Sequence, residues 1–586
     1  MSTSSYYLGI DVGTGSARAS LIDAAGHVAH VATVDTLTHR DPSDHRIFEQ
    51  STDNIWAAIA SAIHTCLSQF QVAPEAVKGL GFDATCSLAV SDFEGQPVRV
   101  TRGAELGTHG DRNVILWADH RAEKEADLIN SSGSVVLDYV GGTMSLEMEI
   151  PKILWLKTHM PPALFGRCQF FDLPDFLTYR ATSAPTRSCC SLTCKCSFIP
   201  QTGWKDDFFT KIGLGDLVEG KYKQIGAADR EKDVLTAGLP VGRGLCKKAA
   251  EELGLVEGTP VGSGVIDAYA GWLGTVGARS TVDGKLSSLP SLDESRHRLA
   301  AVAGTSTCHL VQSPEGVFVN GVWGPYRDAL FRGWWMNEGG QSSTGQLIDF
   351  ILTNHPAYPL LREQGKVQGK SIFVVLQDIL DRLRDDEHAA SFTELLKDVH
   401  MYPDFHGNRS PIADPRMRGS LVGLTLDATL PDLARKYYLA LESIALQTRH
   451  IIDTLNAAGH EVREIYMSGG QATNGVLMRL FADVCGMGVV VPRAGEHAGA
   501  VVRGAAMLGR FAAEAAARGG EGAAMGEKEQ GEALWRIMVE MTPPGTLVSP
   551  SASPREKKLL EAKYKIFRES IDIQKRWRKE MEEAMK

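Results

Sequence analysis

The chain has 586 residues, more than one ordinary hydrophobic core contains, so we expect two or more domains. Its 43% hydrophobic and 23% charged residues are typical of globular proteins and disfavour a disordered or fibrous chain. A net charge of −10, with no strongly basic block at either end, disfavours nucleic acid or an anionic membrane as the main partner.

The first part of the chain is predicted to open with three strands joined by tight turns. Apolar runs at 6–11, 17–23 and 27–34 alternate with glycine-containing turns. Residues 52–70 place apolar side chains at helical spacing, which predicts an amphipathic helix. Residues 79–92 return to a strand pattern. The sequence therefore predicts a β-meander followed by a helix and a further strand.

Asp267 stands where a predicted strand meets a predicted helix. The strand ends at this aspartate, the helix begins at Ala268, and the neighbouring residues are small. Phosphorylation of an alcohol needs a base that accepts the hydroxyl proton, and a carboxylate suits that role. Aspartate is also common as a helix N-cap. Spacing alone leaves both interpretations of Asp267 open.

A similar meander is predicted in the middle of the chain. Strands are expected at 300–303, 307–312 and 317–322, with glycine turns at Gly304 and Gly316 between them. The glycine turns are spaced much as they are in the first meander. The repetition suggests a duplicated domain.

Three further features follow in the second half. The Gly469-Gly470 turn opens a predicted helix over 472–485, with Asn474 in its first turns, an arrangement suited to a nucleotide. An alanine-rich helix is expected at about 498–516. From Pro554 onward a charged helix carries a short apolar stripe, for which docking on the body is favoured over a coiled coil.

Two glycine turns, one in each half, could hold phosphate groups. Gly13 and Gly15 let backbone N–H groups approach an anion without a Cβ in the way. Asp11, at the end of the preceding strand, could hold a hydrated Mg²⁺ beside those phosphates. The turn from Gly304 to Ser306 offers a second loop. An isolated turn of this kind is as often an ordinary hairpin, but the two together could clasp a triphosphate between domains.

These motifs resemble those of the FGGY carbohydrate kinases, members of the actin-like ATPase superfamily. The segment 9–18 is similar to the family's first phosphate motif, 304–307 to the second and 468–474 to the adenosine motif. The segment 264–271 resembles the one that bears the catalytic aspartate. The resemblance runs from about residue 7 to residue 509.

The resemblance implies an α/β protein with two ribonuclease-H-like domains and an interdomain cleft. We expect an N-terminal domain over 1–272, on the sugar side and with the catalytic aspartate. A C-terminal domain over 273–552, on the nucleotide side, and a helical extension over 553–586 would follow.

The subgroup that the sequence resembles is that of the pentulose kinases related to ribulokinase. The segments 117–122, 187–195 and 337–342 are similar to substrate-side motifs of that subgroup, and 83–88 is similar to the Thr-Cys-Ser-Leu signature of eukaryotic D-ribulose kinases. Glu149 and Leu439 depart from the family pattern and leave the exact subgroup open. The implied substrate-binding residues are Thr85, Cys86, Ser87, Asp119, Lys195, Asp267 and Glu338.

The resemblance further implies ATP and Mg²⁺ as cofactors, with Asp267 as the general base. Asp11 and Asp267 would face the metal. The implied reaction is phosphorylation of a ketopentose at its terminal C5 hydroxyl, with D-ribulose as the favoured substrate. The implied nucleotide-binding residues are Gly13, Thr14, Gly15, Gly304, Thr305, Ser306, Gly345, Gly469, Gly470 and Asn474.

Two alternatives remain open on the sequence. One is a kinase for another polyol, such as L-ribulose, xylulose, ribitol or glycerol. The other is an actin-like ATPase that switches shape and is not a kinase. We expect a sugar and ATP as partners, neither nucleic acid nor a membrane, and a homo-oligomer is compatible with the sequence. The start of the chain carries no recognisable secretory signal, so a cytoplasmic protein with reduced thiols is expected.

Overall fold

The computed structural model describes residues 5–493, 495–496, 499–518 and 525–586. They form two compact units, each assembled from segments that are separate in the sequence. Unit 1 consists of Met1–Arg296, Leu310–Glu338 and Ala498–Pro544. Unit 2 consists of His297–His309, Gly339–His497 and Gly545–Lys586.

A five-stranded sheet forms the centre of unit 1. Its strand order is β12-β6-β1-β2-β3. The pairs β1–β2 and β2–β3 are antiparallel, whereas β1–β6 and β6–β12 are parallel. The predicted opening meander is therefore confirmed. The strands are β1 (Tyr6–Val12), β2 (Ser16–Asp23), β3 (Val28–Asp35), β6 (Val77–Ala84) and β12 (Val261–Ile266).

Three helices share one hydrophobic core with this sheet. They are α1 (Thr52–Phe70), α5 (Leu173–Thr182) and α10 (Lys247–Leu253). Helix α1 matches the predicted range, and the Ser51 side chain caps it by accepting a hydrogen bond from the Asn54 N–H. Apolar side chains at helical spacing on α1 thus bury one face of the sheet.

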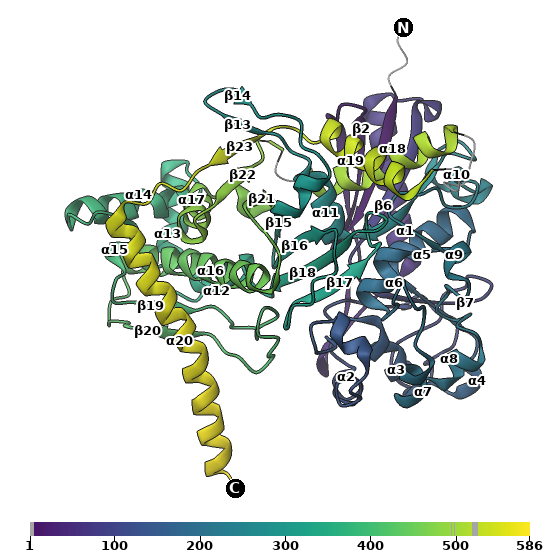
Figure 1. Cartoon of the computed structure of the whole chain (residues 1–586), viewed down its shortest axis with the longest axis horizontal. Coiled ribbons are helices and arrows are strands. Elements are labelled where there is room, and N and C mark those ends of the chain that lie inside the picture. Colours follow the sequence, from purple (N-terminus) through teal and green to yellow (C-terminus); the bar gives the residue numbers. More distant parts are fainter. Residues whose placement is uncertain (1–4, 494, 497–498, 519–524) are drawn as a thin grey trace. The chain divides into compact units, whose positions relative to one another are not determined.

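Glycines on the strands allow helix α18 (Ala500–Ala517) to lie directly on the sheet (Figure 1). A Cβ at Gly9 would lie 1.8 Å from the Val502 carbonyl oxygen, and one at Gly81 would lie 2.1 Å from that of Ala505. Helix α18 also packs on α11 (Asp267–Val276) and α19 (Glu527–Met541). Residues near the C-terminus therefore complete the core of the unit that contains the N-terminus.

A second five-stranded sheet in unit 1 has the order β4-β5-β8-β7-β9 and is antiparallel throughout. The strand predicted at 79–92 is in fact two strands, β6 and β7, which belong to different sheets. The chain turns between them at Thr85, whose N–H donates to the Val12 carbonyl. The strands are β4 (His39–Asp41), β5 (Asp44–Gln50), β7 (Leu88–Asp92), β8 (Val114–Ile115) and β9 (Cys168–Asp172).

Shorter elements complete unit 1. The helices are α2 (Glu123–Asn130), α3 (Glu149–His159), α4 (Pro162–Phe165), α6 (Cys189–Lys195), α7 (Asp206–Lys211), α8 (Gly215–Glu219) and α9 (Arg230–Asp233). The strands are β10 (Arg187–Ser188), β11 (Val234–Leu235), β13 (Ser280–Val282), β14 (Lys285–Leu286) and β17 (Trp323–Arg327). Strands β16 (Thr307–Ser313) and β18 (Trp335–Gln341) contribute residues to both units.

The second predicted meander is only partly correct. Strands β15 (Arg298–Ala303) and β16 form as predicted, but residues 317–322 are not a strand. The Gly321 N–H donates to the Gly141 carbonyl, and Val322 closes a turn onto Val319. The glycine directs this apolar segment into a turn that packs on residues near 140.

Unit 2 is built on parallel strands. Strand β21 pairs in parallel with both β15 and β22, and β23 pairs antiparallel to β22. The strands are β21 (Glu464–Ser468), β22 (Gly488–Val491), β23 (Gly545–Val548), β19 (His400–Tyr402) and β20 (Ser420–Val422). The helices are α12 (Gly345–Thr353), α13 (Tyr358–Gln368), α14 (Ile372–Asp386), α15 (Phe392–Leu395), α16 (Leu430–Ala458) and α17 (Gly475–Cys485).

The predicted C-terminal helix is confirmed as α20 (Pro554–Ala584), and it belongs to unit 2. Leu560, Tyr564, Phe567 and Ile571 are buried, so one face of its first half docks on the body as expected. The Lys563 ammonium on the same face lies 3.3 Å from the buried Glu442 carboxylate on α16. The helix is thus an integral part of unit 2.

The limits of the two units differ from the predicted boundaries at 272 and 552. Unit 1 takes in Leu310–Glu338 and Ala498–Pro544 because β17 and α18 pack within it.

Among the described residues, none of the helices is long and apolar enough to span a membrane.

Candidate active site

Three aspartates stand at the ends of adjacent strands in the central sheet of unit 1. Asp11 on β1 and Asp83 on β6 are register partners across a parallel pair. Asp267 follows β12, which pairs with β6 on its other side. Because the carboxyl ends of parallel strands meet at one edge of a sheet, the three carboxyl groups lie close together.

The three carboxyl groups perturb one another. Burial raises the pKa of Asp83 well above its usual value, and the charges of Asp11 and Asp267 raise it further. Burial likewise raises the pKa of Asp11, against the opposing effect of Arg18, whose guanidinium lies 3.3 Å away. Carboxyl groups in such proximity favour the binding of protons or a cation at this edge.

The carboxyl group of Asp267 has a raised pKa and accepts one backbone hydrogen bond. Burial first and Asp11 second raise the pKa of its carboxyl group to about 7, while a hydrogen bond from the Ala268 N–H acts in the opposite direction. That hydrogen bond is 2.7 Å long and comes from the next residue, whereas an N-cap side chain accepts from the second or third helical N–H. Ile266 occupies the N-cap position. Asp267 is therefore not the N-cap of α11, and its role as a base stays a prediction.

The predicted sugar-binding residues Lys195 and Glu338 meet within unit 1. The Lys195 ammonium lies 3.9 Å from the Glu338 carboxylate and 4.3 Å from the centre of the Trp323 ring. Both charges act on the pKa of Asp267, and the Lys195 charge acts on that of the Cys86 thiol, which burial raises. The structure thus brings Lys195, Glu338, Cys86 and Asp267 together.

The other predicted sugar-side residues are engaged with the protein itself. The Thr85 and Ser87 hydroxyls hydrogen-bond to each other at 3.1 Å, and the Ser87 hydroxyl accepts from the Trp117 N–H. The buried Asp119 carboxylate accepts hydrogen bonds from the Phe48 N–H and from the Arg121 guanidinium. Asp119 therefore supports its own loop, and direct sugar contact by these three residues stays a prediction.

The loop between β1 and β2 is exposed at its tip. The Gly13 N–H donates to the Ser16 carbonyl, and the Thr14 hydroxyl accepts a hydrogen bond from the Trp117 indole N–H. Neither Gly13 nor Gly15 has a positive φ, but a Cβ at Gly15 would meet nothing within 4 Å. Glycine at this tip leaves room beside the backbone, as the proposed phosphate contact requires.

The remaining predicted nucleotide-binding residues lie together in unit 2. A Cβ at Gly345 would lie 2.5 Å from the Gly304 carbonyl oxygen, and one at Gly469 would lie 2.2 Å from that of Ala303. The Thr305 carbonyl accepts from the N–H of Thr344. Both positions require glycine, because an added Cβ would clash with the backbone. Gly345 and Gly469 form a compact group with Thr305, Ser306 and Gly470.

Asn474 begins helix α17 beside this group. Its side chain accepts a hydrogen bond from the Leu477 N–H, so it is the N-cap of the helix. Its amide also donates to the Tyr437 hydroxyl at 2.7 Å. A helix N-terminus with a capping amide is suited to binding an anion or a polar ring. The Asn474 side chain, however, already bonds to the Leu477 N–H and the Tyr437 hydroxyl.

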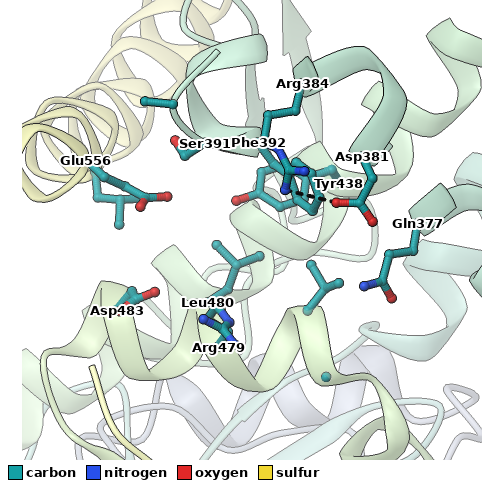
Figure 2. Close-up of a pocket in the computed structure, with 14 residues that line it drawn as sticks. Gln377, Asp381, Arg384, Ser391, Phe392, Tyr438, Arg479, Leu480, Asp483 and Glu556 are labelled. Carbon is teal, nitrogen blue, oxygen red and sulfur yellow. Dashed lines mark ion pairs between the residues drawn. The ribbon is translucent and has the colours of Figure 1, made fainter. Parts of the chain in front are cut away.

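A separate pocket of about 560 Å³ lies on another face of α17 (Figure 2). Helices α14, α16 and α20 and residues 390–392 supply its other walls, where Arg384 forms an ion pair with Asp381. Glu556 and Leu560 reach it from the C-terminal helix. None of the predicted site residues lines this pocket.

Sequence reasoning missed several residues at these sites. Asp83 is one of them. It stands at the end of a predicted strand, as Asp11 and Asp267 do, and that shared position was a usable signal. Gln471 joins the Gly304 carbonyl to the Thr344 hydroxyl with hydrogen bonds of 2.7 and 2.6 Å. No pattern in the sequence indicated that contact, because it joins three distant segments.

The carboxyl groups could hold a magnesium ion only with water and phosphate as further ligands. Among the described residues, no group of three or more histidine, cysteine, aspartate or glutamate side chains is arranged to hold a metal. Mg²⁺ in phosphoryl-transfer sites is usually bound by one or two carboxylates, with water and phosphate completing its shell. Asp11 and Asp267, whose charges repel each other, fit that requirement.

Sequence profiles of known families match most of the chain. The N-terminal domain of the FGGY family of carbohydrate kinases matches residues 6–206, and its C-terminal domain matches residues 299–513. The D-ribulokinase YDR109C of Saccharomyces cerevisiae is 46% identical over 87% of this chain and 72% of its own length. An FGGY carbohydrate kinase domain-containing protein of Xenopus laevis is 40% identical over 98% of this chain and 97% of its own length.

Solved structures show the same fold. The xylulose kinase of Rhodospirillum rubrum superposes with a TM-score of 0.72 at 18% identity, over 98% of this chain and 99% of that one. The glycerol kinase of Plasmodium falciparum superposes with a TM-score of 0.70 at 14% identity, over 97% and 98%. The predicted architecture of two ribonuclease-H-like domains is confirmed, and the chain is a phosphotransferase that belongs to the FGGY family of carbohydrate kinases.

Proposed function

We propose that this enzyme transfers the γ-phosphoryl group of ATP to the C5 hydroxyl of a ketopentose, with D-ribulose as the preferred substrate. The observation that carries the proposal is the position of Asp267, whose carboxyl group has a pKa of about 7 and neighbours Lys195 and Glu338. The similarity to a D-ribulokinase at 46% identity supports the choice of sugar.

The sugar would bind to unit 1. Lys195 and Glu338 offer a buried donor and a buried acceptor for sugar hydroxyls, and Cys86 lies next to them. Buried polar groups that pair with particular hydroxyls discriminate between sugars, since an epimer leaves one of them without a partner. Ser87 and Asp119 would contribute by holding their own loops through hydrogen bonds with Trp117 and Phe48.

Backbone groups are the candidates for holding ATP, and each group is considered within its own unit. The group around Gly304, Gly345 and Gly470 in unit 2 would bind the nucleotide, with Asn474 beside the adenosine. The loop from Gly13 to Gly15 in unit 1 would contact the phosphates. Asp11 and Asp267 would hold Mg²⁺, which neutralises charge on the phosphate oxygens.

In the proposed reaction, the Asp267 carboxylate accepts the proton of the C5 hydroxyl. The hydroxyl oxygen forms a bond to the γ-phosphorus, and the bond between that phosphorus and the β,γ-bridging oxygen breaks. The products are the sugar 5-phosphate and ADP, and the proton remains on Asp267 until solvent removes it. A base with a pKa near the working pH accepts and releases a proton efficiently.

A coupled assay of ADP release tests the proposal with a panel of D-ribulose, L-ribulose, D-xylulose, ribitol and glycerol. We expect D-ribulose to give the highest kcat/KM, and ³¹P–¹³C NMR of the product to place the phosphate at C5. Preference for another sugar would retain the kinase and overturn the choice of substrate. ATP turnover that no sugar stimulates would instead favour an ATPase switch.

A further inference from the structure

The Trp323 side chain lies against the proposed sugar-binding lysine in unit 1. The Lys195 ammonium is 4.3 Å from the centre of the Trp323 ring and 3.9 Å from the Glu338 carboxylate. All three side chains are buried. A buried ammonium is costly unless its charge is compensated, and both a carboxylate and the face of an aromatic ring attract it. The ring and the carboxylate thus hold the Lys195 ammonium from two sides.

The position of the ring follows from the pairing of β17 with β18. Trp323 and Glu338 are register partners in this antiparallel pair. Residues directly opposite each other on antiparallel strands have their side chains on the same face of the sheet, a few ångströms apart. The ring and the carboxylate are therefore presented side by side, which explains why both reach the same ammonium.

An irregularity in this strand pair follows directly after Trp323. The register shifts between Trp323 and Tyr326. Gly324 has a φ of 99°, and a Cβ there would lie 2.4 Å from the Met336 carbonyl oxygen, so the backbone at this point requires glycine. Such irregularities redirect the neighbouring side chains and are frequent beside active sites. We attribute the direction of the Trp323 ring to this one.

Helix α6, which ends at Lys195, is tied to the same strand. The Tyr326 hydroxyl donates a hydrogen bond of 3.3 Å to the Cys194 carbonyl, and the Cys189 thiol donates to the Arg327 carbonyl at 3.6 Å. These bonds join the segments that carry the ring and the ammonium, and no ligand takes part in them. The ring is therefore placed beside the ammonium by the protein itself.

We propose that Trp323 is a positioning residue for the sugar site: its ring holds the Lys195 ammonium beside Glu338 before the sugar binds. The inference rests on the proposed role of Lys195 in sugar binding. A lysine ammonium on its flexible four-carbon stem loses conformational freedom when it binds a ligand, and an ammonium that is already held loses less. The ring thus contributes to the affinity for the sugar, and no direct contact between the two is required.

The test compares Trp323→Phe with Trp323→Leu in steady-state kinetics with ATP and the sugar that gives the highest kcat/KM in the panel. Both replacements are smaller than tryptophan, but only phenylalanine keeps an aromatic face. We expect Trp323→Leu to raise the sugar KM by about tenfold, the loss that removal of a desolvated cation–π contact produces. Trp323→Phe should stay within about threefold of wild type, and the KM for ATP should be unchanged in both.

Trp335→Leu provides a matched control on the same pair of strands. The Arg327 guanidinium lies 5.7 Å from the centre of the Trp335 ring, and these two residues are also register partners. The substitution removes a contact of the same kind away from Lys195, so it should leave the sugar KM unchanged. If Trp323→Leu does not fold, Trp323→Met replaces it, with the same expected rise in sugar KM.

Three kinetic results would overturn the inference. The first is a wild-type sugar KM in Trp323→Leu or in its replacement Trp323→Met. The second is an equal rise in Trp323→Phe and Trp323→Leu, which would show that the aromatic face is not what matters. The third is a rise of the same size in Trp335→Leu, which would trace the effect to the strand pair as a whole.

A double-mutant cycle in thermal unfolding tests the contact without any sugar. The Tm shifts of Trp323→Leu and Lys195→Met should not add up to that of the double variant, because each single change already removes the shared contact. Additive shifts would overturn the inference even if D-ribulose is the substrate. Coupled shifts in an enzyme that no sugar of the panel activates would overturn the proposed function and support the contact between Trp323 and Lys195.

Discussion

At the scale of single residues, the edge of the central sheet of unit 1 brings three buried carboxyl groups together. Asp11, Asp83 and Asp267 end three neighbouring strands, and Arg18 forms an ion pair with only the first of them. The burial of Asp83 and its two acidic neighbours raise its pKa well above the usual value. Asp267 is the member that combines a pKa near neutrality with proximity to the sugar-side charges Lys195 and Glu338.

Replacement of the proposed base gives a direct prediction. Asp267→Asn should lower kcat by about 10²- to 10⁴-fold, because the hydroxyl loses its proton acceptor. Binding of ATP, measured by calorimetry, should persist. Asp293→Asn, a change at a side chain that is 66% exposed in the short helix Asp293–His297, is the control and should be active. A kcat above about one hundredth of wild type would contradict the assignment of the base.

The raised pKa of Asp267 also predicts how activity and stability depend on pH. The base acts when ionised, so kcat/KM for the sugar should rise with pH through about 7 and level off above it. The folded state binds this proton more tightly than the unfolded chain, so ionised Asp267 lowers stability above pH 7. That loss diminishes as the pH falls from 7 towards 4.

Thermal unfolding at two pH values measures the second effect. Asp267→Asn should raise the Tm relative to wild type more at pH 8 than at pH 5, since only at the higher pH does the wild-type folded state hold the charge. An equal shift at both values would show that the carboxyl group titrates normally in the folded enzyme.

At the scale of elements, helix α18 packs closely against β1, β6 and α11. This packing depends on glycines in the two strands and in α18. The strands β1 and β6 present Gly9 and Gly81 to its backbone. On the helix itself, a Cβ at Gly504 would lie 1.9 Å from the Ala270 carbonyl oxygen of α11. Side chains at these positions would force the helix away from the sheet and from the helix that begins with Asp267.

Gly504→Ala should therefore destabilise unit 1 by about 3 kcal/mol, since an added methyl group meets backbone that cannot move aside. The shift in the urea midpoint measures this loss. Gly215→Ala is the matched control in helix α8, where a Cβ would meet nothing within 4 Å. It should leave the midpoint unchanged or raise it slightly, because alanine restricts the unfolded chain. Equal effects of the two substitutions would show that α18 tolerates a larger spacing.

At the scale of the whole molecule, neither unit corresponds to a continuous stretch of chain. Unit 1 needs Ala498–Pro544 to cover its sheet, and unit 2 needs Gly545–Lys586 to add β23 and α20. The last hundred or so residues are thus divided between the two units. We expect the folding of unit 1 to require α18, because the glycine-lined face of its sheet otherwise remains exposed.

A fragment experiment tests this dependence. Residues 1–338 alone should aggregate or show little protection from protease, whereas the same residues joined by a flexible linker to 498–544 should give a protected core. Limited proteolysis and circular dichroism compare the two fragments. A stable fragment 1–338 would show that α18 is not required for unit 1 to fold.

Much of the architecture was predictable from local patterns. The opening meander, the helix over 52–70 and the helix from Pro554 follow from apolar periodicity and turn residues, which are local properties. The predicted strand over 317–322 failed because Gly321 directs the chain into a turn that packs on Gly141, far away in the sequence. Tertiary contact overrode local propensity there.

The sequence by itself determined the family, the glycine turns and the aspartate at the junction of β12 and α11, because each depends on residue types at short, readable spacings. Only the tertiary structure decided that Asp83 joins Asp11 and Asp267, and that the Asp119 carboxylate accepts hydrogen bonds from the Arg121 guanidinium. Those outcomes depend on burial and on contacts between distant segments. Asp267 was readable as a candidate from its place in the chain, but its pKa arises from neighbours that only folding brings to it.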